Sequence, residues 1–190
     1  MNKFITVFCL IFVLCLSTLS AQGNDNPAYK NIVNHFAARE FASTAVTKAE
    51  IEQVIQAGIR APSARNLQPW TFTVVQKDVN LAKRIVPQAG DGNALIIVSA
   101  AGDGKTNGAV ILDCGLAVQS MYLAAQAIGL GSRIYTGPID SINKNLKKEL
   151  GIPETHSAVA LIRIGKIPAN IDAVSSASPR NDTAKMVTWR

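Results

Sequence analysis

The segment Ala61–Trp70 places several hydrogen-bonding side chains in one short connection. Ser63, Asn66 and Gln68 each carry donor and acceptor groups, and two prolines restrict the backbone around them. Side chains held in this way are suited to bind a flat heteroaromatic ring that carries carbonyl groups and ring nitrogens. The alternative is a turn in which Ser63 and Asn66 cap local backbone groups. Residue types and spacing alone leave both interpretations open.

The cysteines and histidines do not indicate a second kind of chemistry. Cys114 lies among apolar residues at helical spacing, which predicts a small buried side chain rather than a nucleophile. His35 and His156 are far apart in the sequence and lack ligand-like neighbours. Because no Ser/His/Asp, Cys/His or metal-ligand spacing is present, we expect neither a catalytic side chain nor a metal.

Helical and extended patterns alternate along the chain and place the polar segment between a helix and a strand. Helices are predicted from the Thr47 cap to Pro62, from Asp78 to Val86, over Ala109–Ile128 and from Asp140 to Gly151. Strands are predicted over Trp70–Gln76, Ala94–Ala101 and Ser157–Gly165, with extended chain at Arg133 and Ile134. The sum is an α+β fold, one sheet with helices packed over it. Residues 167–178 predict an extended arm before an apolar C-terminal end.

The first residues have the pattern of a secretory signal peptide. A basic start at Met1–Lys3 precedes the apolar run Phe4–Leu19, and small residues follow up to Ala21. A membrane-spanning helix needs about 20 apolar residues, and this run meets Ser, Thr and Gln too soon. We therefore expect a signal peptide over residues 1–21, one domain over residues 22–190, export to the periplasm and no membrane span after cleavage.

Charge and composition exclude some partners. The chain of 190 residues has a formal net charge of +6, which favours anionic ligands without identifying one. Its basic residues are scattered, with no run and little aromatic interleaving. Nucleic acid is therefore not an expected partner.

The polar segment carries a family resemblance. Pro-Ser-x-x-Asn-x-Gln-Pro-Trp, at residues 62–70, resembles the flavin-binding signature of the FMN-dependent nitroreductase family. Asp113–Gln119 is similar to the start of that family's long dimer helix, and Ala124–Gly131 is similar to its end. Gly151–Glu154 and the strand after it also fit. The resemblance implies a homodimer with a central, mostly antiparallel sheet, flanking helices and an extended C-terminal arm.

The same resemblance assigns FMN as the cofactor and suggests how it is held. Arg39 would lie near the pyrimidine edge of the flavin, where a positive charge stabilises the reduced ring. Tyr135–Gly137 would pass the ring face, and Arg180 would reach the phosphate, although a surface arginine in a Ser-rich tail is the alternative for Arg180. The full expected set is Arg39, Pro62, Ser63, Asn66, Gln68, Tyr135, Thr136, Gly137 and Arg180.

Two features depart from the family pattern. The family has Arg-x-Ser as an N-terminal phosphate clamp, whereas His35 and Ala37 stand at those positions here. This chain lacks one guanidinium and one hydroxyl, which predicts weaker FMN binding or a substituting role for His35 at acidic pH. Residues 86–93 and 102–108 are also short where larger members cover the substrate. We therefore expect an open acceptor site.

The resemblance implies a reductase with two half-reactions at one site. A hydride donor, NAD(P)H in the family, would reduce the flavin, and a small-molecule acceptor such as a nitroaromatic or a quinone would then reoxidise it. Export conflicts with this donor, because NAD(P)H is not expected outside the cytoplasm. The alternative is an exported flavin-binding or structural dimer without reductase turnover.

Overall fold

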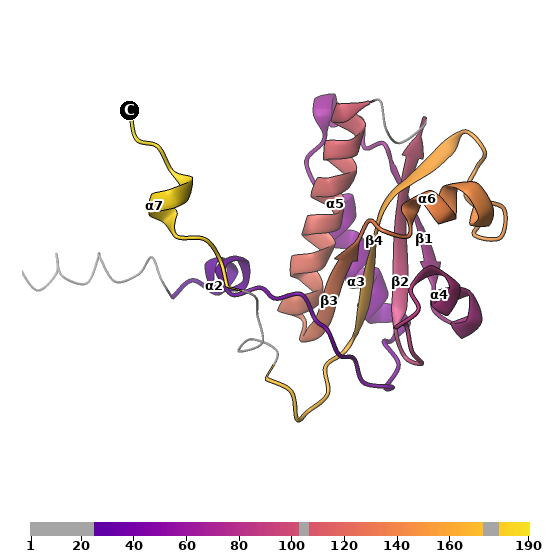
Figure 1. Ribbon diagram of the computed structural model, residues 1–190, viewed down its shortest axis with the longest axis horizontal. Coiled ribbons are helices and arrows are strands. Elements are labelled where there is room, and N and C mark those ends of the chain that lie inside the picture. Colours follow the sequence, from indigo (N-terminus) through magenta and orange to yellow (C-terminus); the bar gives the residue numbers. More distant parts are fainter. Residues whose placement is uncertain (1–24, 103–106, 173–178) are drawn as a thin grey trace, which may run out of the picture. The chain divides into compact units, whose positions relative to one another are not determined.

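The computed structural model describes residues 25–102, 107–172 and 179–190 (Figure 1). The expected signal peptide, residues 1–21, lies outside the described residues. The chain divides into the units Met1–His35 and Phe36–Arg190. In the first unit, Asn26 caps the short helix α2, Pro27–Val33, by accepting hydrogen bonds from two backbone N–H groups of its first turn.

The second unit is built on one four-stranded antiparallel sheet. Its strands are β1 (Trp70–Val75), β2 (Ala94–Ala101), β3 (Leu130–Tyr135) and β4 (His156–Lys166), in the order β1-β2-β4-β3. All three neighbouring pairs are antiparallel. The nearly continuous burial of β2 agrees with its place inside the sheet and its unbroken apolar sequence. The predicted α+β class and antiparallel sheet are confirmed.

Helices cover both faces of this sheet (Figure 1). On one face, α3 (Lys48–Ile59) and α5 (Gly108–Ala127) pack against the strand side chains that include Ile96 and Ile162. On the other face, α4 (Val79–Ile85) and the segment from α6 (Ile139–Ser141) through Ile142–Leu146 pack against the alternate side chains. Apolar residues on both faces explain why the inner strands lack a polar alternation.

Local capping groups set several helix boundaries where the sequence predicts them. The capping box of Thr47 and Glu50 begins α3, and Asp78 begins α4 by accepting the Leu81 N–H at 2.8 Å. Gly129 has a left-handed φ of 80° directly after α5. The helix expected from Asp140 differs: it begins at Ile139 and continues as a π-helical segment over Ile142–Leu146.

Among the described helices, α5 alone is long and apolar enough to cross a membrane. It packs on the sheet and on α3, and its inner side buries Asp113, Cys114 and Met121. Because one side of α5 packs in the core and buries a carboxylate there, α5 is the central helix of the domain. Its outer side leaves Leu112 62% exposed.

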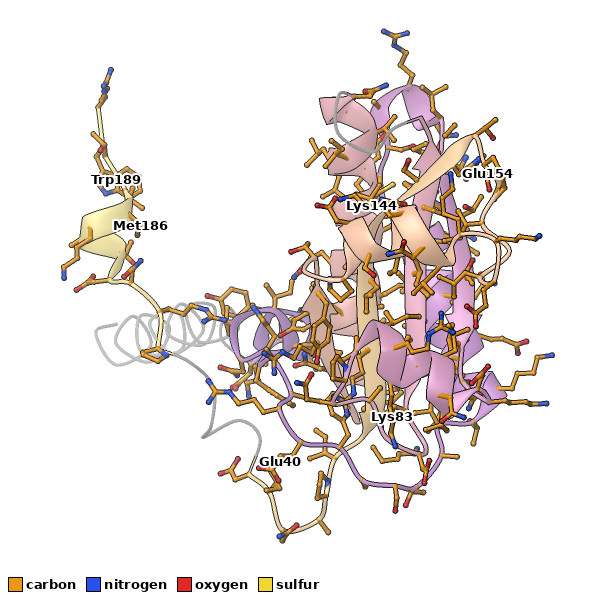
Figure 2. All side chains as sticks on the ribbon, turned by 45° about the vertical axis from the view of Figure 1, so that its right-hand side comes forward. Glu40, Lys83, Lys144, Glu154, Met186 and Trp189 are labelled. Atoms are coloured by element: carbon orange, nitrogen blue, oxygen red, sulfur yellow. The ribbon has the colours of Figure 1, made fainter. Side chains whose placement is uncertain are left out.

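The described part of the C-terminal arm contains one short helix, α7, Thr183–Met186. Met186 is exposed and Trp189 is 88% exposed (Figure 2). Figure 2 also shows Lys83 on α4 and Lys144 on the π-helical segment, so these basic side chains lie on different elements.

Candidate functional site

The Ser63–Gln68 loop has a backbone that most residues avoid. It joins α3 to β1 and contains the 3₁₀ turn Ala64–Asn66. Arg65, Asn66 and Gln68 have φ values of 53°, 57° and 47°, in the left-handed region that favours glycine. Such conformations cost about 1 kcal/mol or more each and persist only where surrounding contacts enforce them. Backbone strain concentrated in an exposed loop is typical of a binding site.

Hydrogen bonds inside the loop settle part of the question that the sequence leaves open. The Gln68 N–H donates to Ser63 Oγ at 3.0 Å, so Ser63 does cap local backbone. Gln68 Nε2 donates to Asn66 Oδ1 at 3.2 Å, which pairs these two side chains. Pro62, Asn66 and Gln68 are exposed, and Ser63 is half-buried. Ser63 Oγ thus caps a local backbone group, while the amides of Asn66 and Gln68 remain at the surface.

A carboxylate from α5 holds the start of this loop. Both oxygens of Asp113 accept the Ala64 N–H, at 3.0 and 3.2 Å, and Asp113 is only 4% exposed. The sequence resemblance places Asp113 only at the start of the central helix and does not indicate this contact. Asp113 is the one charged residue in the sequence of α5, and a carboxylate in such a helix requires a hydrogen-bonding partner if it is buried.

The segment that carries Arg39 is held by the other end of α5. Gln126 Oε1 accepts the Phe36 N–H at 3.1 Å, and Gln126 Nε2 donates to the Phe36 carbonyl at 2.8 Å. Farther along, the Ala38 N–H donates to the Ser132 carbonyl at 2.9 Å. Phe36 and Ala38 are buried, and Arg39 is exposed. Alternation along this extended segment thus directs Arg39 outward.

A buried arginine anchors the same segment beyond Arg39. The guanidinium of Arg163 on β4 stacks on the ring of Phe41, 4.1 Å from its centroid, and Arg163 Nε donates to Asn93 Oδ1 at 2.8 Å. A Cβ at Gly165 would come within 2.6 Å of the Phe41 ring. The lack of a side chain at Gly165 therefore lets Phe41 lie against the sheet.

The expected flavin contacts Tyr135, Thr136 and Gly137 lie at and directly after the end of β3. Tyr135 is half-buried, with the Arg133 guanidinium 5.2 Å from its ring centroid, and Thr136 and Gly137 are exposed. A Cβ added at Gly137 would meet nothing within 4 Å. Packing within the chain therefore does not require glycine there. Arg180 lies in the C-terminal arm and is exposed.

Two of the expected site segments are attached to opposite ends of α5. Asp113 holds the Ser63–Gln68 loop near the start of α5, and Gln126 holds the Arg39 segment near its end (Figure 1). At about 1.5 Å of rise per residue, these two attachment points lie about 20 Å apart along the helix. The loop that carries Asn66 and the segment that carries Arg39 are therefore attached near opposite ends of α5.

Comparison with known proteins supplies the family. The Nitroreductase family profile matches residues 32–102 and 87–166. The chain belongs to the nitroreductase family. A candidate NADH dehydrogenase/NAD(P)H nitroreductase from Archaeoglobus fulgidus is 31% identical over 146 residues, 72% of this chain and 83% of that protein. The resemblance seen in the sequence is thereby confirmed.

Solved structures agree with this assignment to the nitroreductase family. A candidate nitroreductase from Desulfovibrio desulfuricans in complex with FMN has a TM-score of 0.74 and 27% identity, and covers 88% of this chain and 98% of its own. A candidate NADH dehydrogenase/NAD(P)H nitroreductase from Bacteroides thetaiotaomicron has a TM-score of 0.72 and 25% identity. The match covers 87% of this chain and 98% of that protein. The nitroreductase fold expected from the sequence is confirmed.

Neither a large groove nor the free thiol contributes to the site expected in this nitroreductase-family chain. A groove of about 630 Å³ runs beside β1 and is lined by residues of α3, β1 and α4, but by none of the expected flavin contacts. Burial, aided by the negative charge of Asp113, raises the pKa of the Cys114 thiol to about 11. Cys114 is therefore a packed thiol, as its sequence context predicts.

Proposed function

We propose that this chain is an FMN-dependent oxidoreductase that takes hydride from NAD(P)H and reduces a small-molecule acceptor, such as a nitroaromatic or a quinone. The Ser63–Gln68 loop is the observation that carries the proposal. Its strained backbone presents exposed amide groups, and a buried carboxylate outside the loop holds it in place. The A. fulgidus relative and the FMN complex from D. desulfuricans support the donor and the cofactor.

The residues present fit a flavin nucleotide by their chemistry. Ser63 and Asn66 offer donors and acceptors to ring carbonyls and nitrogens, and Arg39 offers a cation to the reduced ring. The open space beside Gly137 leaves room for a ring to approach the backbone. FMN, when bound, supplies the hydride chemistry of the two half-reactions. The role of the chain is to bind the ring, orient it and place positive charge beside it.

The attachment of the Asn66 loop and the Arg39 segment near opposite ends of α5 supports a homodimer with shared sites. The outer side of α5 exposes Leu112, and this helix carries one site segment near each end. If two α5 helices pack antiparallel about a two-fold axis, the start of one helix lies beside the end of the other. The Asn66 loop of one copy then faces Arg39 of its partner. Two equivalent flavin sites form, and each uses both chains.

A subunit-mixing experiment tests this arrangement. Arg39→Ala and Asn66→Ala homodimers should each bind FMN weakly. A heterodimer of the two variants, isolated through two different affinity tags, contains one site with both native residues and should bind FMN at about half the wild-type stoichiometry. Heterodimers that bind no better than either homodimer would place the site within one chain.

One observation favours the alternative of a flavin-binding protein without turnover. His35 Nδ1 lies 2.5 Å from the Ile32 carbonyl, and Ala37 has no polar side chain. The two positions of the family's phosphate clamp therefore supply few groups that could bind a phosphate. The absorption spectrum of the purified protein shows whether flavin is bound. NAD(P)H oxidation with a nitroaromatic or quinone acceptor then separates the two functions. Bound FMN without oxidation of either donor would favour the alternative.

We also propose that the protein is exported and that the mature chain begins near Gln22. The basic, apolar and small-residue order of residues 1–21 supports this proposal. N-terminal sequencing of protein recovered from the periplasm of the producing cell tests it. Recovery of the chain with Met1 intact would contradict export through a cleaved signal.

A further inference from the structure

Asp113 is a buried acid on the side of α5 that packs in the core. It is 4% exposed, and among the described residues its hydrogen bonds go only to the Ala64 N–H. No described lysine or arginine forms a salt bridge with it. A buried carboxylate that is satisfied by one backbone group is weak support for stability, because an apolar side chain of similar volume avoids the desolvation cost.

The place of this contact points to another role. Ala64 begins the 3₁₀ turn, and the residue before it, Ser63, makes no side-chain cap to the turn. Asp113 supplies that cap from a different element, directly before the left-handed residues Arg65 and Asn66. The remaining hydrogen bonds of the loop are internal. The Asn66 N–H donates to the Ser63 carbonyl, the Leu67 N–H to the Ala64 carbonyl and the Gln68 N–H to Ser63 Oγ, and Gln68 Nε2 donates to the carbonyl and Oδ1 of Asn66.

Internal bonds can fix the shape of a loop but not its placement on the domain. Among the described hydrogen bonds of residues 63–68, the one from Ala64 to Asp113 ties this loop to another element of the domain. We propose that Asp113 is a positioning residue that holds the Ser63–Gln68 loop in the conformation that presents Asn66 to the flavin ring. This inference rests on the function proposed above.

Riboflavin titrations of two variants test the proposal, because riboflavin reports on the ring site without the phosphate. Asp113→Leu keeps the number of side-chain heavy atoms and the branch at Cγ but removes the acceptor, and it should weaken riboflavin binding roughly 10- to 100-fold while the melting temperature does not fall. Asp113→Asn keeps an acceptor oxygen for the Ala64 N–H and should retain most of the affinity. Cys114→Ala, at the neighbouring buried position, is the matched control and should bind riboflavin as the wild type does.

A double-mutant cycle separates positioning from general damage. Since Asp113 acts through Asn66, the double variant Asp113→Leu/Asn66→Ala should bind riboflavin no more weakly than the weaker single variant, within about twofold. Asp113→Leu combined with Arg39→Ala should be additive, because Arg39 lies on a separate segment. Additivity with Asn66→Ala, unchanged binding in Asp113→Leu, or equal losses in the Leu and Asn variants would each overturn the proposal.

Trypsin supplies a measurement that needs no flavin. Arg65 is exposed in the loop, and cleavage after it should be several-fold faster in Asp113→Leu than in wild type when the loop is released. Cleavage after exposed Lys77, between β1 and α4, is the internal control. An unchanged rate at Arg65 overturns the holding role and leaves the proposed function intact. Wild-type protein that binds no flavin overturns the proposed function, while faster cleavage would still show that Asp113 holds the loop.

Discussion

Burial decides the chemistry of the one cysteine in the described chain. Cys114 is fully buried, and burial raises its pKa to about 11, so its thiolate is almost absent at neutral pH. For a chain that begins at Gln22, in which Cys114 is the one cysteine, we expect no reaction of the folded protein with a thiol reagent at pH 8 and one equivalent of reaction per chain after unfolding in urea. Rapid labelling of the folded protein would show that the α5 core opens.

At the proposed flavin site, the charge of Arg180 and the shape supplied by Asn66 should contribute separately to ligand affinity. Arg180→Ala should weaken FMN binding and spare riboflavin, because a charge-assisted bond to phosphate is worth roughly 1.5–3 kcal/mol and riboflavin has no phosphate. Asn66→Ala should weaken both ligands alike, since Asn66 is assigned to the ring. Fluorescence titrations of both variants measure the difference, and added salt should weaken wild-type FMN binding more than riboflavin binding. Equal losses of both ligands in Arg180→Ala would remove the phosphate assignment.

At the scale of elements, an ion pair joins the start of α3 to the end of β4. Lys166 donates to Glu50, and Glu50 Oε2 also accepts the Thr47 N–H at 2.9 Å. The Lys166 hydrogen bond, followed by that from Thr47, lowers the pKa of Glu50 from 4.5 to about 2. The capping box thus fixes both a helix start and a contact between distant elements.

This lowered pKa predicts how stability depends on pH. A carboxyl group whose pKa is depressed by folding contributes stability above its unfolded value and loses that contribution as pH falls through the folded value. The wild type should therefore be more stable than Glu50→Gln by about 1–2 kcal/mol at pH 7. The difference should shrink between pH 4.5 and about 2. Urea unfolding across this range measures it, and a difference that does not change with pH would contradict the assigned cause.

The elements also show which features are readable from sequence. Thr47, Asp78 and Gly129 act through near neighbours in the chain, so their helix boundaries were predictable. The left-handed loop was not, because neither Arg65 nor Gln68 has an intrinsic preference for that conformation and a tertiary contact stabilises it. The contacts of Asp113 and Gln126 were missed for the same reason: packing of α5 sets them, not spacing.

For the whole molecule, the exposed side of α5 is the surface that the proposed dimer would bury. Leu112→Glu places a charge on that side, and burying it against a second copy would cost several kcal/mol. Light scattering at micromolar concentration should show a dimer for the wild type and a monomer for this variant. Asn80→Glu, which adds the same charge at an exposed position of α4, should remain dimeric. A wild type that is monomeric would contradict the proposed assembly.

The distance of about 20 Å between the two attachment points on α5 has a genetic consequence if the sites are shared. A chain that carries both Arg39→Ala and Asn66→Ala gives one damaged half to each site of any dimer it joins. Paired with a normal chain, it therefore disables both sites, whereas a defect confined to self-contained subunits leaves the normal subunit active. Expressed beside the wild-type gene, the doubly altered allele should behave as a dominant negative, and each singly altered allele should be milder because it leaves one site whole.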